Sequence, residues 1–272
     1  MDKATFGGIV LAVVGILGGM TIEGGKIVQI LQPTAAMIVI CGTIGAVMIN
    51  FPLSVVMESF ARLTGVFFEK ANNLEALVTE LVGYAQLARK DGIVSLDKEL
   101  EKVRDAFLKK SLMLAVDGTE PEELRRMMEL EMDNQAEREE KIPAVFEAAG
   151  GFSPTIGIIG AVLGLIRVMQ HLDNITEVGR GIAVAFVATI YGVALANIFF
   201  LPSAGKLKIR LREEQVGREM ILAGVIAILE GMNPRMVETK LRGYMPGGGK
   251  EAGGKKSAVA GNMGPMPITS AG

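Results

Sequence analysis

Four long runs without a single Lys, Arg, Asp or Glu divide this sequence. They cover residues 4–22, 27–57, 148–166 and 181–205. An α-helix rises about 1.5 Å per residue, so roughly 20 apolar residues cross a hydrocarbon core about 30 Å thick. Each run is long enough to cross a membrane. The sequence therefore predicts an all-α, polytopic membrane protein with four transmembrane helices and a large helical cytoplasmic insert.

The composition supports a membrane protein and gives no support for a nucleic-acid-binding or disulfide-stabilised one. Hydrophobic residues make up 50% of the 272-residue chain, and its mean hydropathy is +0.39. The net charge of −2 gives no basis for nucleic-acid binding. Cys41 is the only cysteine, so no disulfide can form within the chain, and we expect it to be a packing residue.

The order of the runs predicts five segments. Residues 1–57 form a first transmembrane hairpin, and residues 58–147 a helical insert with an i, i+3, i+4 apolar stripe. Residues 148–205 form a second transmembrane hairpin, and residues 206–242 a C-terminal helix. Residues 243–272 are rich in Gly, Ala, Ser and Pro, which predicts a disordered tail.

Local signals in the insert predict two turns and a helix start. Asp91-Gly92 and Asp117-Gly118 are turn sequences. Thr119, three residues before Glu122, has the spacing of a capping box and predicts the N-cap of a long helix that runs to the third span.

Basic residues predict the orientation in the membrane. One side of the spans carries Arg62, Lys70, Lys141, Lys206, Lys208, Arg210 and Arg212, and the other only Lys26, Arg167 and Arg180. Basic residues favour the cytoplasmic side. We therefore expect the N-terminus, the insert and the C-terminus in the cytoplasm.

The spans contain no carboxylate. Ion pumps and proton relays normally carry an Asp or Glu within the membrane. Here the spans offer only neutral polar groups, so a titrating carboxylate has to come from a partner. Gly15/Gly19 and Gly160/Gly164 have the spacing that lets helix backbones approach closely. No catalytic motif or metal-ligand pattern appears, so we do not expect an enzyme.

Several segments resemble a known family. They are GFSPTIGIIGAVLGL (151–165), GIAVAFVATIYGVAL (181–195), GMNPR (231–235), LARKDGI (87–93) and VDGTEPEEL (116–124). Together they resemble the MotA/PomA family, the A subunit of the bacterial flagellar stator. The resemblance extends from the first span to about Arg242, and the tail has no counterpart.

The resemblance implies an ion-driven motor in the bacterial inner membrane. In that family several A subunits, five in number, ring the spans of two B subunits, which supply the ion-binding aspartate. Ion flow turns the A ring, and the insert pushes the rotor protein FliG. Pro154 and Thr189 would line the ion path, and Pro234 would match a second functional proline that couples ion flow to the insert.

Four further positions follow from the resemblance. Arg89 and Lys90 would match basic residues that contact the rotor, and Asp97 stands where the family usually has Glu. At Ala161 sodium-driven relatives tend to have threonine, whose hydroxyl could bind a hard cation. Alanine offers no such oxygen, which favours protons over sodium as the translocated ion. No cofactor is expected.

Three other interpretations compete with the stator. A transport motor of the ExbB/TolQ type works by related physics, but those relatives have three spans. A self-contained channel or transporter predicts intramembrane charges or broken helices in inverted repeats, and neither is evident. A structural scaffold gives no reason for Arg89, Lys90 and Asp97 to lie where a rotor-facing surface is expected.

Overall fold

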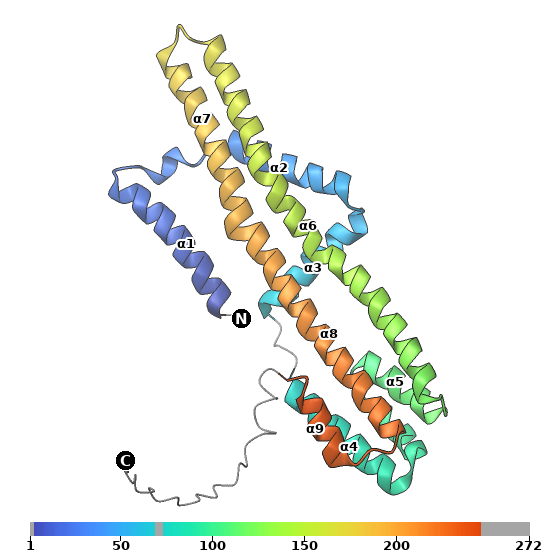
Figure 1. Ribbon diagram of the computed structural model, residues 1–272. Helices are drawn as coiled ribbons and strands as arrows, with labels where there is room; N and C mark the ends of the chain where they lie inside the picture. The colour runs from blue at the N-terminus through green and yellow to red at the C-terminus, as the bar shows by residue number, and fades with distance from the viewer. Residues whose placement is uncertain (1–2, 69–72, 246–272) are drawn as a thin grey trace, which may run out of the picture.

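The computed structural model describes residues 3–68 and 73–245. Within these ranges the secondary structure is entirely helical (Figure 1). The first half of the chain contains α1 (Lys3–Ile22), η1 (Ile27–Gln29), α2 (Pro33–Asn50), α3 (Leu53–Phe68), α4 (Leu74–Asp91), η2 (Ile93–Glu99) and α5 (Ala106–Val116). The second half contains α6 (Pro121–Gln170), α7 (Ile175–Ala194), η3 (Leu195–Phe200), α8 (Leu201–Leu229) and α9 (Pro234–Arg242).

Four of the described helices are long and apolar enough to cross a membrane. They are α1, α2, α6 and the continuous helix that starts with α7. The predicted all-α fold with four spans is therefore confirmed. The second span is shorter than its apolar run, because Phe51 is extended and Pro52 separates α2 from α3. A residue that precedes proline is disfavoured in the helical conformation.

Two long helical rods connect the apolar and polar parts of the molecule. α6 has 50 residues, which corresponds to about 75 Å, and it continues through Pro143 and Pro154. α7, η3 and α8 follow one another without a break and lie against α6 (Figure 1). The predicted segment boundaries after residues 147 and 205 thus fall inside continuous helices.

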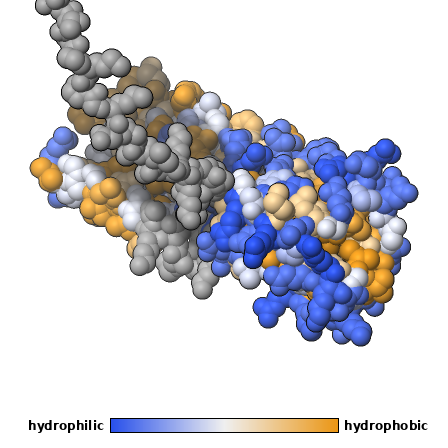
Figure 2. All heavy atoms as spheres, turned by 60° about the horizontal axis from the view of Figure 1, so that its bottom comes forward, coloured by the Kyte–Doolittle hydropathy of each residue, from blue (hydrophilic) through white to orange (hydrophobic). Residues whose placement is uncertain are grey.

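The lobe, which we define as α4, η2, α5, α9 and the adjoining ends of α6 and α8, has its own hydrophobic core. Its largest fully buried side chains are Leu81, Leu96, Leu108, Leu112, Leu124, Met128, Met220, Ile226 and Leu241. Figure 2 shows mostly hydrophilic side chains over the lobe and more hydrophobic ones toward the opposite end. This division agrees with a water-exposed insert and a membrane-embedded remainder.

Caps and turns begin and end the helices of the lobe. Asp105 caps α5 by accepting a hydrogen bond from the Leu108 amide at 2.8 Å. Gly92 and Gly118 have positive φ of 83° and 82°, which confirms both predicted turns. The capping box predicted at Thr119 is wrong, because α6 begins one residue later, with Glu120 as N-cap and Pro121 at the first helical position. Proline suits that position because the missing N–H would have no partner there.

The predicted tail lies mainly outside the described residues. Met245 is the last described residue, so the disordered tail expected for residues 246–272 stays a prediction.

Small residues bring α6 and α7 into backbone contact. A Cβ added at Gly192 would stand 2.5 Å from the Ser153 carbonyl oxygen and 3.1 Å from the Gly157 Cα. Further along the pair, a Cβ at Gly164 would stand 2.8 Å from the Gly181 carbonyl oxygen. The Ser153 hydroxyl also donates to the Gly192 carbonyl at 3.0 Å. The close approach predicted at Gly160/Gly164 therefore occurs within this chain, between its third and fourth spans, whereas a Cβ at Gly15 or Gly19 would meet nothing within 4 Å.

A buried ion cluster joins α3, α6 and α8 between the lobe and the spans. Glu139 is 6% exposed and accepts two hydrogen bonds of 3.0 Å from the Arg218 guanidinium. Arg62 and Gln135 donate to the same carboxylate at 3.2 and 3.0 Å. Burial opposes ionisation of Glu139, but the hydrogen bonds and positive charge of Arg218 outweigh it and hold the pKa below its ordinary value.

The α6–α7 contact predicts a sharp difference between two glycines of the same helix. Gly192→Ala should destabilise the protein by about 1–3 kcal/mol, because the new methyl group meets backbone atoms that cannot move aside. Gly179→Ala should be neutral or slightly stabilising, since a Cβ there meets nothing within 4 Å. Thermal unfolding in detergent, followed by circular dichroism, measures both. Equal melting temperatures would contradict the close packing.

The ion cluster predicts a stability loss and a change in pH dependence. Glu139→Gln leaves Arg218 without its charged partner and should cost about 2–3 kcal/mol. Because the folded pKa is lowered, the stabilisation is present above the ordinary value of 4.5 and is lost as the pH falls through the folded value. Unfolding of the wild type should therefore become easier below about pH 4.5, and the variant should lack this step. Glu140→Gln, at an exposed neighbour, is the control.

Candidate functional site

The structure brings Pro154 and Thr189 together at the α6–α7 contact. A Cβ at Gly192 would stand 3.2 Å from the Pro154 Cα, and a Cβ at Gly157 would stand 3.3 Å from the Thr189 Cα. Both residues are half-buried. Two positions that are 35 residues apart in sequence thus flank one tight contact between the third and fourth spans.

Ala161 lies one helical turn beyond Gly157 on α6 and is also half-buried. Its neighbour Gly160 faces α7, because a Cβ there would meet the Ala188 methyl group at 2.7 Å. Ala161 is therefore next to the contact on the same helix as Pro154. Its methyl side chain adds no oxygen atom to the site.

The polar atoms of this site accept hydrogen bonds or donate through a hydroxyl, and none of them is ionisable. The Thr189 hydroxyl donates to the Ala185 carbonyl at 3.3 Å, and its lone pairs can still accept. Pro154 has no N–H, so the Gly150 carbonyl loses its usual helical donor. Among the described residues no cluster of three metal-ligating side chains occurs. Such a site can pass a hydrated ion or coordinate it weakly, but the charge has to be supplied by another group.

Sequence reasoning missed a second special position, at Pro202. It follows η3, a π-helical turn in which the Leu201 amide donates to the Ala196 carbonyl five residues back. A proline inside a helix clashes with the carbonyl four residues earlier and cannot donate to it. The wider π turn relieves both problems directly before the proline. A proline near the end of the apolar run 181–205 was the available signal, but the π turn has no signature in sequence.

Pro234 lies in the lobe, away from the spans. It occupies the first turn of α9, where Asn233 caps the helix by accepting from the Arg235 amide at 3.1 Å. α9 packs on α4 and α8 through the fully buried Val237 and Leu241. The structure thus separates Pro234 from Pro154 and Thr189 by the length of α8 (Figure 1). Any coupling role of Pro234 has to act through the packing of the lobe.

Three charged residues are exposed on the lobe around the Gly92 turn: Arg89, Lys90 and Asp97. Arg89 and Lys90 close α4, and Asp97 lies in η2 after the Gly92 turn (Figure 1). Within the described part of the chain, none of the three side chains has an ion pair or a hydrogen bond. The structure therefore places three unpaired charges on either side of one turn, available to an external surface.

Family models match most of the chain. Residues 6–92 match the motility protein A N-terminal model, and residues 99–220 match the MotA/TolQ/ExbB proton channel family. The chain is 39% identical over 247 residues to motility protein A of Bacillus subtilis, covering 90% of this chain and 92% of that protein. It is 32% identical to chemotaxis protein PomA of Vibrio alginolyticus over 245 residues, covering 90% and 96% of the two chains.

Solved structures agree with the sequence matches. The structure of C. jejuni MotAB contains a chain that is 31% identical, with a TM-score of 0.86 and coverage of 90% of this chain and 96% of that one. The flagellar MotAB stator complex from Bacillus subtilis contains a chain that is 39% identical, with a TM-score of 0.82 and coverage of 90% and 97%. The chain therefore belongs to the MotA/TolQ/ExbB proton channel family and, within it, to the motility A proteins that act as torque-generating subunits of the flagellar stator.

Proposed function

We propose that this stator subunit forms a ring of five copies around two B-type subunits and conducts protons past them. Two linked observations carry the proposal. The candidate ion path has no carboxylate, and uninterrupted helices connect it to a lobe that has unpaired charged side chains at its surface. The two solved structures described above are of C. jejuni MotAB and of the Bacillus subtilis MotAB stator complex, which supports a B-type partner. The partner would supply the ion-binding aspartate that these spans lack.

The ion path in this proposal follows the face of α6 and α7 near Pro154 and Thr189. The Thr189 hydroxyl and the Gly150 carbonyl offer neutral oxygens to a hydrated proton close to the partner carboxylate. Ala161 offers none, which supports protons rather than sodium. No cofactor and no enzymatic step takes part.

Coupling relies on the two rods. α6 and the α7–η3–α8 helix run from the candidate ion path into the lobe, so a displacement of the spans moves the lobe with them. The Glu139 cluster ties α3, α6 and α8 together along the way. Pro234, at the start of α9, would transmit this displacement to α4, on which α9 packs.

The rotor-facing surface would be the α4–η2 turn. Arg89, Lys90 and Asp97 are exposed there, and we propose that they contact acidic and basic side chains of the rotor protein FliG. This requires the lobe and both termini to lie in the cytoplasm and the spans in the bacterial inner membrane. The excess of basic residues on the lobe side of the spans supports that orientation.

A transport motor of the ExbB/TolQ type is the remaining alternative. The family model that covers residues 99–220 includes such proteins. The separate match of residues 6–92 to the motility protein A N-terminal model, with four spans instead of three, favours the stator.

Motor rotation tests the proposed function and the ion together. A motile cell without its own stators should rotate its flagella when it receives this chain and the B-type subunit of the same organism. Rotation should persist when sodium is withdrawn at constant proton-motive force, because Ala161 gives sodium no extra ligand. Rotation that stops without sodium would contradict the proton assignment. A stable complex in the membrane with no rotation in either medium would contradict the stator role.

Charge reversal tests the rotor contact. Arg89→Glu should reduce stall torque by at least half, because like charges would then meet at the contact. Lys109→Glu reverses an exposed charge on α5 without an ion pair among the described residues and should leave torque within about a tenth of the wild type. Tethered-cell rotation under high load measures both. Unchanged torque in the Arg89 variant would refute the contact.

A further inference from the structure

The hydroxyl group of Tyr191, in the fourth span, connects α7 to the first hairpin. It donates a hydrogen bond to the Ile30 carbonyl at 2.5 Å and accepts one from the Gln32 amide at 3.4 Å. Ile30 and Gln32 lie between η1 and α2, 161 and 159 positions before Tyr191. One side chain thus bonds to two backbone groups of the α1–α2 connection, which we define as residues 27–32.

The α1–α2 connection needs these bonds because part of its backbone is not helical. Gln32 is extended, with φ of −118° and ψ of 98°. Within residues 3–68 and 73–245, the Ile30 carbonyl and the Gln32 amide have no other hydrogen-bond partner. Val28 and Leu31 are 74% and 64% exposed in an uncharged run, which indicates that the connection faces lipid. Unpaired backbone groups are costly in lipid, and the Tyr191 hydroxyl satisfies two of them at once.

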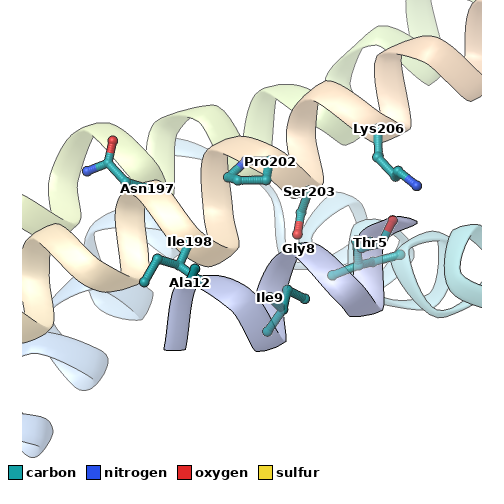
Figure 3. Close-up of a pocket in the computed structure, with 10 residues that line it drawn as sticks. Thr5, Gly8, Ile9, Ala12, Asn197, Ile198, Pro202, Ser203 and Lys206 are labelled. Atoms are coloured by element: carbon teal, nitrogen blue, oxygen red, sulfur yellow. The ribbon is translucent and has the colours of Figure 1, made fainter. Parts of the chain in front are cut away.

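The first hairpin is held mainly by α2, because α1 packs little on the second hairpin. Within the described structure no residue of the α1 span is buried, and α1 lies apart from α7 and α8 (Figure 1). A cavity of about 370 Å³ lies between α1 and α8, with Gly8 and Ile9 on one side and Pro202 and Ser203 on the other (Figure 3). The attachment at Tyr191 therefore acts together with α2 and not with α1.

Tyr191 and Thr189 lie on different sides of α7. Successive residues of an α-helix are about 100° apart, so the two side chains diverge by about 160°. The contact with α6 lies between them, at Gly192. α2 packs on the Tyr191 side, through Ala35 and Val39. Thr189 therefore faces away from the first hairpin, on the side of the candidate ion path.

A rotation of α7 about its own axis would change the direction in which Thr189 points. The glycine contact with α6 allows a close approach, but glycine has no side chain that could interlock and prevent rotation. We propose that Tyr191 is a positioning residue of the ion path, whose hydroxyl sets the rotation of α7 and so keeps Thr189 turned toward the partner carboxylate. This inference rests on the ion path proposed above.

Motor rotation at low load tests the role of the hydroxyl, because ion transit rather than torque limits the speed there. Cells without their own stators receive this chain with its B-type subunit, and the speed is compared per assembled complex. Tyr191→Phe removes only the hydroxyl and should lower the speed at least threefold, while the two subunits still copurify. Tyr84→Phe removes a hydroxyl that donates to Glu80 in the lobe at 2.8 Å and should keep the wild-type speed.

A second substitution separates positioning from a simple loss of stability. Threonine is restricted in its side-chain rotamers, whereas serine lacks the branch at Cβ and can turn its hydroxyl toward the carboxylate from a rotated helix. Adding Thr189→Ser to Tyr191→Phe should therefore restore at least half of the lost speed, measured against Thr189→Ser alone. A protein that is merely less stable would gain nothing from this change.

Three results would overturn the positioning role. They are wild-type speed in Tyr191→Phe, slow rotation that Thr189→Ser does not improve, and loss of the complex in Tyr191→Phe, since the hydroxyl would then serve assembly. A wild-type chain that assembles but does not rotate would contradict the proposed function itself, and this inference with it.

Discussion

The close backbone contact between α6 and α7 is the constraint on which the rest of the structure depends. Gly157 and Gly192 leave so little space that a methyl group on either would meet backbone atoms of the other helix. Apolar side chains give helices little reason to associate within lipid, so this approach and the Ser153–Gly192 hydrogen bond have to hold the third and fourth spans together. The same contact fixes where Pro154 and Thr189 lie relative to each other.

Because both helices continue into the lobe, their contact also determines how motion is transmitted. Neither α6 nor the α7–η3–α8 helix is interrupted, and the Glu139–Arg218 pair connects them again beyond the spans. Along these two rods in the described structure, the π turn before Pro202 is the one segment that is not α-helical, and Pro143 and Pro154 each remove one backbone donor within α6. In the proposed mechanism, ion passage at the spans therefore moves the lobe as one body.

The sequence predicts the number of spans. Charged side chains are costly in lipid, so four long runs without a charged residue indicate four membrane-spanning helices. It also predicts the turns at Gly92 and Gly118, because an Asp-Gly pair favours a turn through the positive φ that glycine adopts easily. Contacts between residues far apart in the chain, such as Glu139 with Arg218, leave no periodic pattern in the sequence and therefore could not be predicted from it. The roles proposed for Pro154 and Thr189 rest on the family resemblance, and the structure adds that both residues flank one tight contact between the third and fourth spans. The separation of Pro234 from them follows from its place in the predicted C-terminal segment 206–242, but the packing of α9 on α4 could not be foreseen.

The most direct test of the account is whether the spans and the lobe move as a rigid unit during ion flow. Spin labels at the outer end of α7 and on α4, in the assembled complex in lipid vesicles, would report the distance between them by pulsed electron resonance. The account predicts the same distance distribution with and without a proton gradient. A shift in that distribution when the gradient is applied would show that the rods flex, and would contradict the proposed transmission of torque.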